Sequence, residues 1–171
     1  MFNIRGFYKI KLIVNCDLHK EKIKAYLLSQ SVKGTVILSP EGINGTIAGI
    51  KSDVNSCIKF IKSRFLIDIF DSENSSTCKF LPFYRAKVKV KKEVVPIGLK
   101  LKASEKKKSY YVNPSQWNKL ICDKNVTLID VRKPFEHKVG TFSGAINPKI
   151  SSFREFPKYF DKLKKNNKIA M

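Results

Sequence analysis

Apolar positions in the first part of the chain predict alternating extended and helical segments. Residues 7–14 form a strand candidate. Asp17, which follows them, can cap a helix whose apolar residues fall on one face. Residues 32–38 form the next apolar strand, which Pro40-Glu41-Gly42 interrupts. A short strand over residues 45–48 follows at once. This stretch therefore predicts the order strand, helix, strand, strand.

A second helix and further extended structure follow. Apolar residues with the i, i+3, i+4, i+7 spacing of an amphipathic helix are Val54, Cys57, Ile58 and Ile61. Residues 67–70 and 84–90 are extended candidates, and in the latter apolar residues alternate with lysines. The order βαββαβ predicts an α+β ferredoxin-like, or acylphosphatase-like, domain over residues 1–97.

Acylphosphatase activity is a separate question from this fold. An acylphosphatase needs a glycine-rich phosphate cradle between the first strand and the first helix. In this chain that stretch, Val14–Leu18, contains no glycine. The sequence therefore argues against acylphosphatase activity.

Residues 98–109, GLKLKASEKKKS, have the composition of a solvated, lysine-rich linker. Behind them Asn113 and Pro114 open a helix in the favoured way, with an Asn cap followed by Pro. We expect a buried stripe on this helix formed by Trp117, Leu120 and Ile121.

The last third of the chain predicts an α/β domain over residues 110–171. Residues 126–131, VTLIDV, are nearly all apolar, as in a strand covered on both faces of a parallel sheet. Another helix is predicted with one face formed by Phe153, Phe156, Phe160 and Leu163. Residues 168–171 begin a further strand. This segment holds about half the elements of a doubly wound domain.

The net charge of +20, from 34 basic and 14 acidic residues, suggests a polyanionic partner. Of the basic residues, 29 are Lys and five are Arg. An AT-rich genome also produces such an excess of surface lysines, whereas nucleic-acid contacts more often use Arg. Charge alone therefore leaves nucleic-acid binding open.

The four cysteines, Cys16, Cys57, Cys78 and Cys122, show no C-x-x-C spacing and stand beside only two histidines. We interpret them as free buried thiols and expect no metal site. No run of about 18 apolar residues occurs, and the N-terminus lacks the features of a secretory signal. A cytoplasmic protein without membrane contact is expected.

Five segments carry a family resemblance. Residues 128–136, LIDVRKPFE, and 140–148, GTFSGAINP, follow the pattern of the entrance to a rhodanese domain. Residues 41–46, EGINGT, 82–88, PFYRAKV, and 151–157, SSFREFP, accompany them. As a set these segments resemble the rhodanese-related, oxygen-dependent tRNA uridine hydroxylases.

The resemblance runs from about Phe7 to Met171 and implies that residues 110–171 are a truncated rhodanese-like domain. It implies an oxidoreductase that forms 5-hydroxyuridine at the wobble position of tRNA. The implied partner is tRNA and the implied co-substrate is molecular oxygen, with no bound cofactor expected.

The resemblance also concerns the catalytic cysteine. In the family, the strand matching Lys168–Met171 leads into a loop that carries this cysteine. We therefore expect the cysteine beyond Met171 and no catalytic residue within the chain, so that the chain alone is inactive. The missing C-terminal half, supplied as a separate polypeptide, is then a candidate partner.

Two readings stay open for Asp130, Arg132 and Glu136. As functional residues they would support an active site around a thiolate. As structural residues they would form an ion-pair network that holds the exit from the strand, which is common scaffolding for Arg. We favour the structural reading. His137, next to them in sequence, is interpreted as a surface residue.

Candidate substrate contacts lie in the first domain. Glu41 and Asn44 could touch a substrate, or they could belong to a hairpin turn in which Gly42, Asn44 and Gly45 adopt positive φ. The sequence alone does not decide between substrate contact and a hairpin turn.

Arg85, Lys87 and Lys89 lie along one face of a strand. They could form a solvated face, or they could track a tRNA backbone beside the preceding aromatic residues.

Two other functions compete with the hydroxylase. One is a rhodanese-type sulfurtransferase with a cysteine persulfide, against which the N-terminal module with its segment 41–46 argues. The other is a non-catalytic RNA-binding remnant of a split gene.

Overall fold

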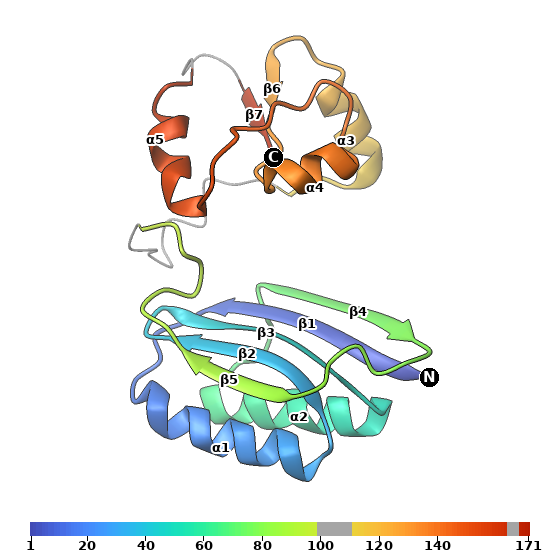
Figure 1. The fold of residues 1–171 in the computed structure, drawn as a ribbon, viewed down its shortest axis with the longest axis vertical. Coiled ribbons are helices and arrows are strands. Elements are labelled where there is room, and N and C mark those ends of the chain that lie inside the picture. The colour runs from blue at the N-terminus through green and yellow to red at the C-terminus, as the bar shows by residue number, and fades with distance from the viewer. Residues whose placement is uncertain (99–110, 164–167) are drawn as a thin grey trace. The chain divides into compact units, whose positions relative to one another are not determined.

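The computed structural model describes residues 1–98, 111–163 and 168–171. It divides into two compact units, Met1–Val95 and Pro96–Met171, drawn in Figure 1. The division lies close to the predicted domain boundary after residue 97. Apart from Gly98, the predicted linker over 98–109 falls outside the described residues.

The first unit contains one sheet and two helices, whose bounds are β1 Phe2–Ile10, α1 Cys16–Ser29, β2 Lys33–Ser39, β3 Gly42–Gly49, α2 Lys51–Phe65, β4 Ser72–Cys78 and β5 Ala86–Val90. The strand order is β4-β1-β3-β2-β5. Within this sheet β2 and β5 pair in parallel, and the other neighbouring strands are antiparallel. The predicted ferredoxin-like arrangement is confirmed for this unit, and β5 extends it at the β2 edge.

The core of this unit lies between the sheet and both helices, which cover the same face (Figure 1). From the sheet, Val36, Ile43 and Ile47 are fully buried. The apolar stripe predicted for α2 is confirmed, since its four residues are all buried. From α1, Ile23 and Leu27 close the core.

The start of the fold differs from the prediction. β1 begins at Phe2 and ends at Ile10, so the predicted strand over 7–14 is wrong in its bounds. Asp17 does not cap α1 either. The cap position belongs to Asn15, whose left-handed backbone (φ 53°) turns the chain into the helix without a side-chain hydrogen bond. Asp17 lies in the first turn, where its charge favours the helix dipole.

The strand predicted over residues 67–70 is also wrong. Ile67 and Phe70 are buried, but they belong to the irregular connection behind α2. The strand is β4, whose sequence SENSSTC is polar and mostly exposed. An apolar pattern cannot predict such an edge strand, because backbone pairing with β1 forms it.

The hairpin predicted around Glu41–Gly45 is placed differently. The turn consists of Pro40 and Glu41, while Asn44 and Gly45 lie inside β3 without positive φ. Gly42 alone of the predicted set has positive φ, at 156°. A Cβ on Gly42 would lie 2.1 Å from the carbonyl oxygen of Lys9, so this glycine permits the close approach of β1.

The second unit contains short elements, namely α3 Pro114–Ile121, β6 Val126–Leu128, α4 Pro134–Val139, the 3-10 helix η2 Phe153–Glu155, α5 Phe156–Phe160 and β7 Lys168–Ala170. β6 and β7 pair in parallel. The predicted cap of α3 is confirmed, since Asn113 and Gln116 exchange hydrogen bonds between side chain and backbone.

Three expectations for the second unit need correction. The strand predicted over 126–131 is regular only to Leu128, with a parallel bridge from Ile129 to Ile146 beyond it. The predicted helix from Phe153 is divided into η2 and α5, and Phe156 is its buried aromatic residue. On α3 no residue is fully buried, so the predicted stripe is half-buried.

Within the described ranges, no helix combines the length and the apolar character needed to cross a bilayer.

The two units should differ in local stability. Most buried apolar residues belong to the first unit, whereas the described part of the second contributes Leu128, Ile129, Phe156 and Ala170. Because slow exchange reflects buried, cooperative structure, amides of β1 and β3 should exchange slowest and those of β6 and α4 much faster. Hydrogen exchange followed by mass spectrometry measures this. Equal protection of both units would contradict it.

Candidate functional site

Asp130 stands just beyond the end of β6 in the second unit. The backbone N–H of Ile129 donates to Ala170 O at 2.8 Å, and that of Asp130 donates to Ile146 O at 2.9 Å. The chain at this point is therefore held between β7 on one side and residue 146 on the other. Sites in parallel sheets form at such carboxyl ends.

The carboxylate of Asp130 organises the loop that follows. Arg132 donates from Nε to Oδ1 at 2.9 Å and from Nη2 to Oδ2 at 2.7 Å. Thr141 Oγ1 donates to Oδ2 at 2.9 Å, and Arg132 Nη2 also donates to Gly140 O at 2.6 Å. The bidentate fork thus joins the strand end to residues 140–141.

The hydrogen bonds between Asp130 and Arg132 shift the pKa values of both groups. The side-chain hydrogen bonds from Arg132 hold the pKa of Asp130 well below its ordinary value, and Thr141 adds to the effect. In return, the bond to Asp130 raises the pKa of Arg132. The carboxylate side chain is only 9% exposed, whereas that of Arg132 is 47% exposed.

Asn147 supports the same turn from the other side. Its amide Nδ2 donates to the carbonyl oxygens of Asp130 at 2.9 Å and of Arg132 at 2.8 Å. Sequence reasoning missed Thr141 and Asn147 as partners of Asp130. Both residues belong to the family-like segment 140–148, which marked the region as important. Sequence spacing alone does not show that their side chains bond to Asp130.

Glu136 does not join this network through a hydrogen bond. Its carboxylate accepts from the backbone N–H of Lys133 at 3.1 Å, which caps α4. The structure therefore brings together Asp130 and Arg132 of the predicted set, while Glu136 caps α4 and its charge also raises the pKa of Arg132. His137 is half-buried rather than a free surface residue, with Nε2 3.4 Å from Ala145 O.

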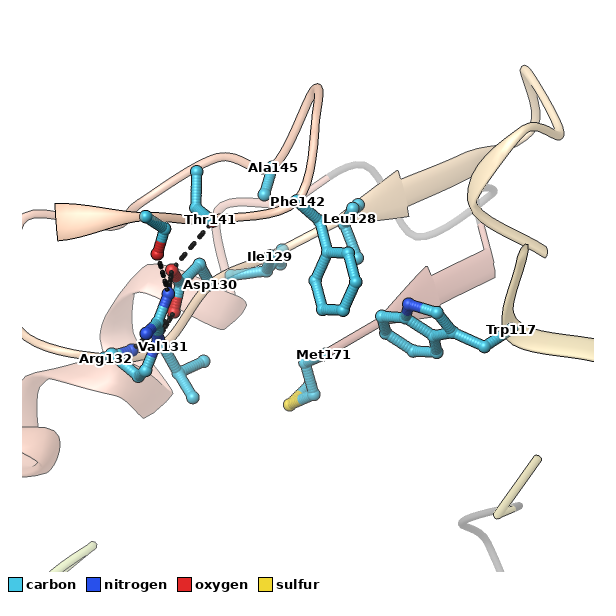
Figure 2. A pocket seen from close by; sticks show the side chains of 11 residues that line it. Trp117, Leu128, Ile129, Asp130, Val131, Arg132, Thr141, Phe142, Ala145 and Met171 are labelled. Carbon is cyan, nitrogen blue, oxygen red and sulfur yellow. Dashed lines mark hydrogen bonds and ion pairs between the residues drawn. The ribbon is translucent and has the colours of Figure 1, made fainter. Parts of the chain in front are cut away.

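A pocket of about 500 Å³ opens beside the Asp130–Arg132 pair. Figure 2 shows the pair at one end and the rings of Phe142 and Trp117 toward the other, with Met171 below them. The two rings lie 5.4 Å apart at 58°. The pocket thus combines an apolar wall with one charged, rigidly held end, as small-molecule sites do.

Trp117 carries an unusual feature for a pocket-lining residue. Its indole Nε1 is buried and has no hydrogen-bond partner among the described residues. An indole N–H is a donor only, so a partner for it must be an acceptor.

The predicted substrate contacts Glu41 and Asn44 lie in the first unit. Glu41 belongs to the turn between β2 and β3, and within the described residues its Oε2 is buried without a partner. Asn44 lies in β3, paired with Tyr8 of β1 and Ile37 of β2. Both residues belong to the first unit, whereas the pocket beside Asp130 is lined by residues of the second.

The three basic residues of the predicted stripe lie before and along β5. Arg85, Lys87 and Lys89 are all exposed. Arg85 and Lys87 also line a hollow of about 340 Å³.

The two buried cysteines, Cys16 and Cys57, are disfavoured as thiolates. Burial raises the pKa of Cys57 to about 12, and Asp53 adds to the shift. Burial likewise raises the pKa of Cys16, with Asp17 adding to it. Cys78 is half-buried and Cys122 is exposed, so the expectation of buried thiols is wrong for Cys122. In the described part of the chain, no group of three or more His, Cys, Asp or Glu residues is arranged for a metal ion.

The family comparison identifies the first unit. The sequence model described as "UPF0176 acylphosphatase like domain" matches residues 2–94. A protein of Pelagibacter ubique (strain HTCC1062) named tRNA uridine(34) hydroxylase is 48% identical over all 171 residues. The chain spans 56% of the length of that relative.

Two solved structures resemble part of the chain distantly. Acylphosphatase from Bacillus subtilis is 12% identical with a TM-score of 0.39, covering 53% of this chain and 100% of its own. Full-length HypF in the phosphate- and nucleotide-bound form is 17% identical with a TM-score of 0.39, over 53% of this chain and 12% of its own. Likenesses at this level support no inference about activity.

The Asp130–Arg132 pair predicts a specific acid titration. Since the pKa of folded Asp130 is depressed, its stabilisation is complete above the ordinary carboxylate range near about pH 4 and is lost as pH falls through the lower native value. Carbon-13 NMR of the Asp130 carboxyl should show a midpoint below about 3.9.

The matched variants test the cause of this shift. Arg132→Gln should move the midpoint upward toward the ordinary value, whereas Lys119→Gln, an exposed change on α3, should leave it in place. An ordinary midpoint in the unsubstituted chain would refute the ion pair.

Proposed function

Because the chain belongs to the family of tRNA uridine(34) hydroxylases with a UPF0176 domain, we propose that it forms part of an enzyme that hydroxylates the wobble uridine of tRNA. The product is 5-hydroxyuridine, and molecular oxygen is the co-substrate. The chain contributes the acylphosphatase-like unit and the strand-end site around Asp130.

The observation that carries this proposal is the extent of the similarity. The Pelagibacter relative matches at 48% identity over the whole chain, through both units and across residues 128–157. A shared N-terminal module alone would support only a common fold. Similarity through the second unit as well supports a common reaction.

The second unit would act as a rigid frame for the reacting groups. Arg132 is fixed at three hydrogen bonds by Asp130 and Gly140, so its charge keeps one position at the edge of the pocket. Fixed charge at the carboxyl ends of parallel strands is the setting in which a reactive anion, such as a thiolate, is stabilised.

The nucleophilic thiol itself is proposed to come from outside these residues. Cys57 and Cys16 are buried with raised pKa values, which disfavours the reactive thiolate. Cys122 is exposed at the end of α3 and does not line the pocket. We propose that this thiol comes from a segment that corresponds to the part of the longer Pelagibacter relative beyond the matched residues.

Hydroxylation can be tested with the chain alone and with the chain joined to the remaining part of the Pelagibacter relative. Unmodified tRNA is incubated in air with each protein and its nucleosides are analysed by mass spectrometry. We expect 5-hydroxyuridine only with the joined protein, and none when oxygen is removed. Cys122→Ser in the joined protein should change nothing.

Three results would contradict the proposal. One is 5-hydroxyuridine formed by the chain alone and abolished by Cys122→Ser, which would make Cys122 the nucleophile. Another is a joined protein that transfers sulfur from thiosulfate but hydroxylates no tRNA, which would favour the sulfurtransferase. A third is a folded joined protein with neither activity, which would favour a non-catalytic RNA-binding chain.

A further inference from the structure

One face of the sheet in the first unit carries no helix. Both α1 and α2 lie on the opposite face (Figure 1), where Ile43 of β3 is fully buried. Because side chains alternate along a strand, Asn44 and Thr46 point to the uncovered side. We call this side the open face.

The strand register arranges the open face in rows across all five strands. One row consists of Ser72, Tyr8, Asn44, Ile37 and Lys89. The neighbouring row consists of Asn74, Gly6, Thr46, Thr35 and Lys87. Neighbouring strands lie about 4.8 Å apart, so each row spans roughly 19 Å.

The chemistry of the open face is distinctive. Among the residues of β1 to β5 that point to it, none is acidic, while Lys87 and Lys89 are exposed cations. The amides and hydroxyls of the two rows supply donors and acceptors, and Tyr8 supplies a half-buried ring on β1. The carboxylate of β4, Glu73, belongs to the helix-covered side, where it pairs with Arg5.

A hollow of about 340 Å³ continues the open face at the β5 edge. Thr35 and Lys87 of the second row line it together with Arg85 and residues 82–84. Within that stretch Tyr84 is 92% exposed. An aromatic ring left in water beside two cations is a suitable stacking surface for a base whose phosphates meet the cations.

We propose that the open face binds a single-stranded segment of RNA, with bases on Tyr8 and Tyr84 and phosphates at Arg85, Lys87 and Lys89. The proposal rests on the proposed function. If the enzyme acts on the wobble uridine, the bound segment is the anticodon loop that holds this nucleotide. Lysines neutralise phosphates, rings stack on unpaired bases, and amides and hydroxyls bond to base edges. The net charge of +20 fits a polyanion.

The test measures binding of the 171-residue chain to a fluorescent anticodon stem-loop RNA by anisotropy. The double substitution Lys87→Glu with Lys89→Glu should weaken binding more than tenfold and reduce the salt dependence by about two phosphate contacts. Tyr8→Leu should weaken it about tenfold, and Tyr8→Phe should restore it because phenylalanine also stacks. Circular dichroism checks that each variant folds.

The matched control carries the same charge change on the covered side. Lys24 on α1 and Lys59 on α2 are exposed lysines on the helices. Reversing both to Glu should weaken binding far less than reversing Lys87 and Lys89. An equal loss in the two pairs would show that only total charge matters and would overturn the proposal.

Two further probes separate RNA from other occupants. A fully paired RNA of the same stem should bind much more weakly than the stem-loop, because its bases cannot stack on the rings. Poly-glutamate of similar charge should also bind weakly and be insensitive to Tyr8→Leu. Tight binding of either probe would overturn the assignment to single-stranded RNA.

The surface and the proposed function can fail separately. If the open-face variants bind RNA like the unsubstituted chain while the joined protein still forms 5-hydroxyuridine, the surface assignment is wrong and the function stands. If the joined protein forms none while binding still depends on Lys87, Lys89 and Tyr8, the function is wrong and the surface assignment stands.

Discussion

Burial of one face of the first unit's sheet against two helices is the constraint on which the rest of that unit depends. Ile43 and Ile47 of β3 and Val36 of β2 must meet the helices, where they are fully buried. The two-residue period of a strand then points every intervening side chain away from the helices. The position of Asn44 and of the lysines of β5 is thus a consequence of core packing. A one-residue slip in register would exchange the two faces.

In the described part of the second unit, an ion pair fixes the loop at the end of a strand. The bidentate bonds between Arg132 and Asp130, with the bond from Arg132 to Gly140, tie the strand exit to the returning loop at the rim of the pocket. The structural and functional readings of this pair need not compete. An arginine held rigidly by a carboxylate can support the loop and also present a fixed positive charge to a ligand in the pocket. The low exposure of Asp130 and the higher exposure of Arg132 agree with this double task.

Sequence reasoning succeeded where burial is periodic. The stripe of α2 and the order of the elements up to α2 followed from apolar spacing, because such spacing directly reports which side chains leave water. It failed for β4, since pairing with β1 rather than apolar content forms that polar edge strand. At the site, Asp130 and Arg132 were predicted together. Thr141 and Asn147 were not, because their contact with Asp130 depends on how the intervening loop returns.

Recognition of tRNA through the open face of the first unit is what we propose for this chain. The most direct measurement is a set of backbone amide NMR spectra of the chain, recorded while an anticodon stem-loop RNA is added. We expect the largest shifts on Tyr8, Asn44, Thr46, Lys87 and Lys89, with α1 and α2 little changed. Shifts concentrated on the two helices, with the open face unchanged, would contradict it.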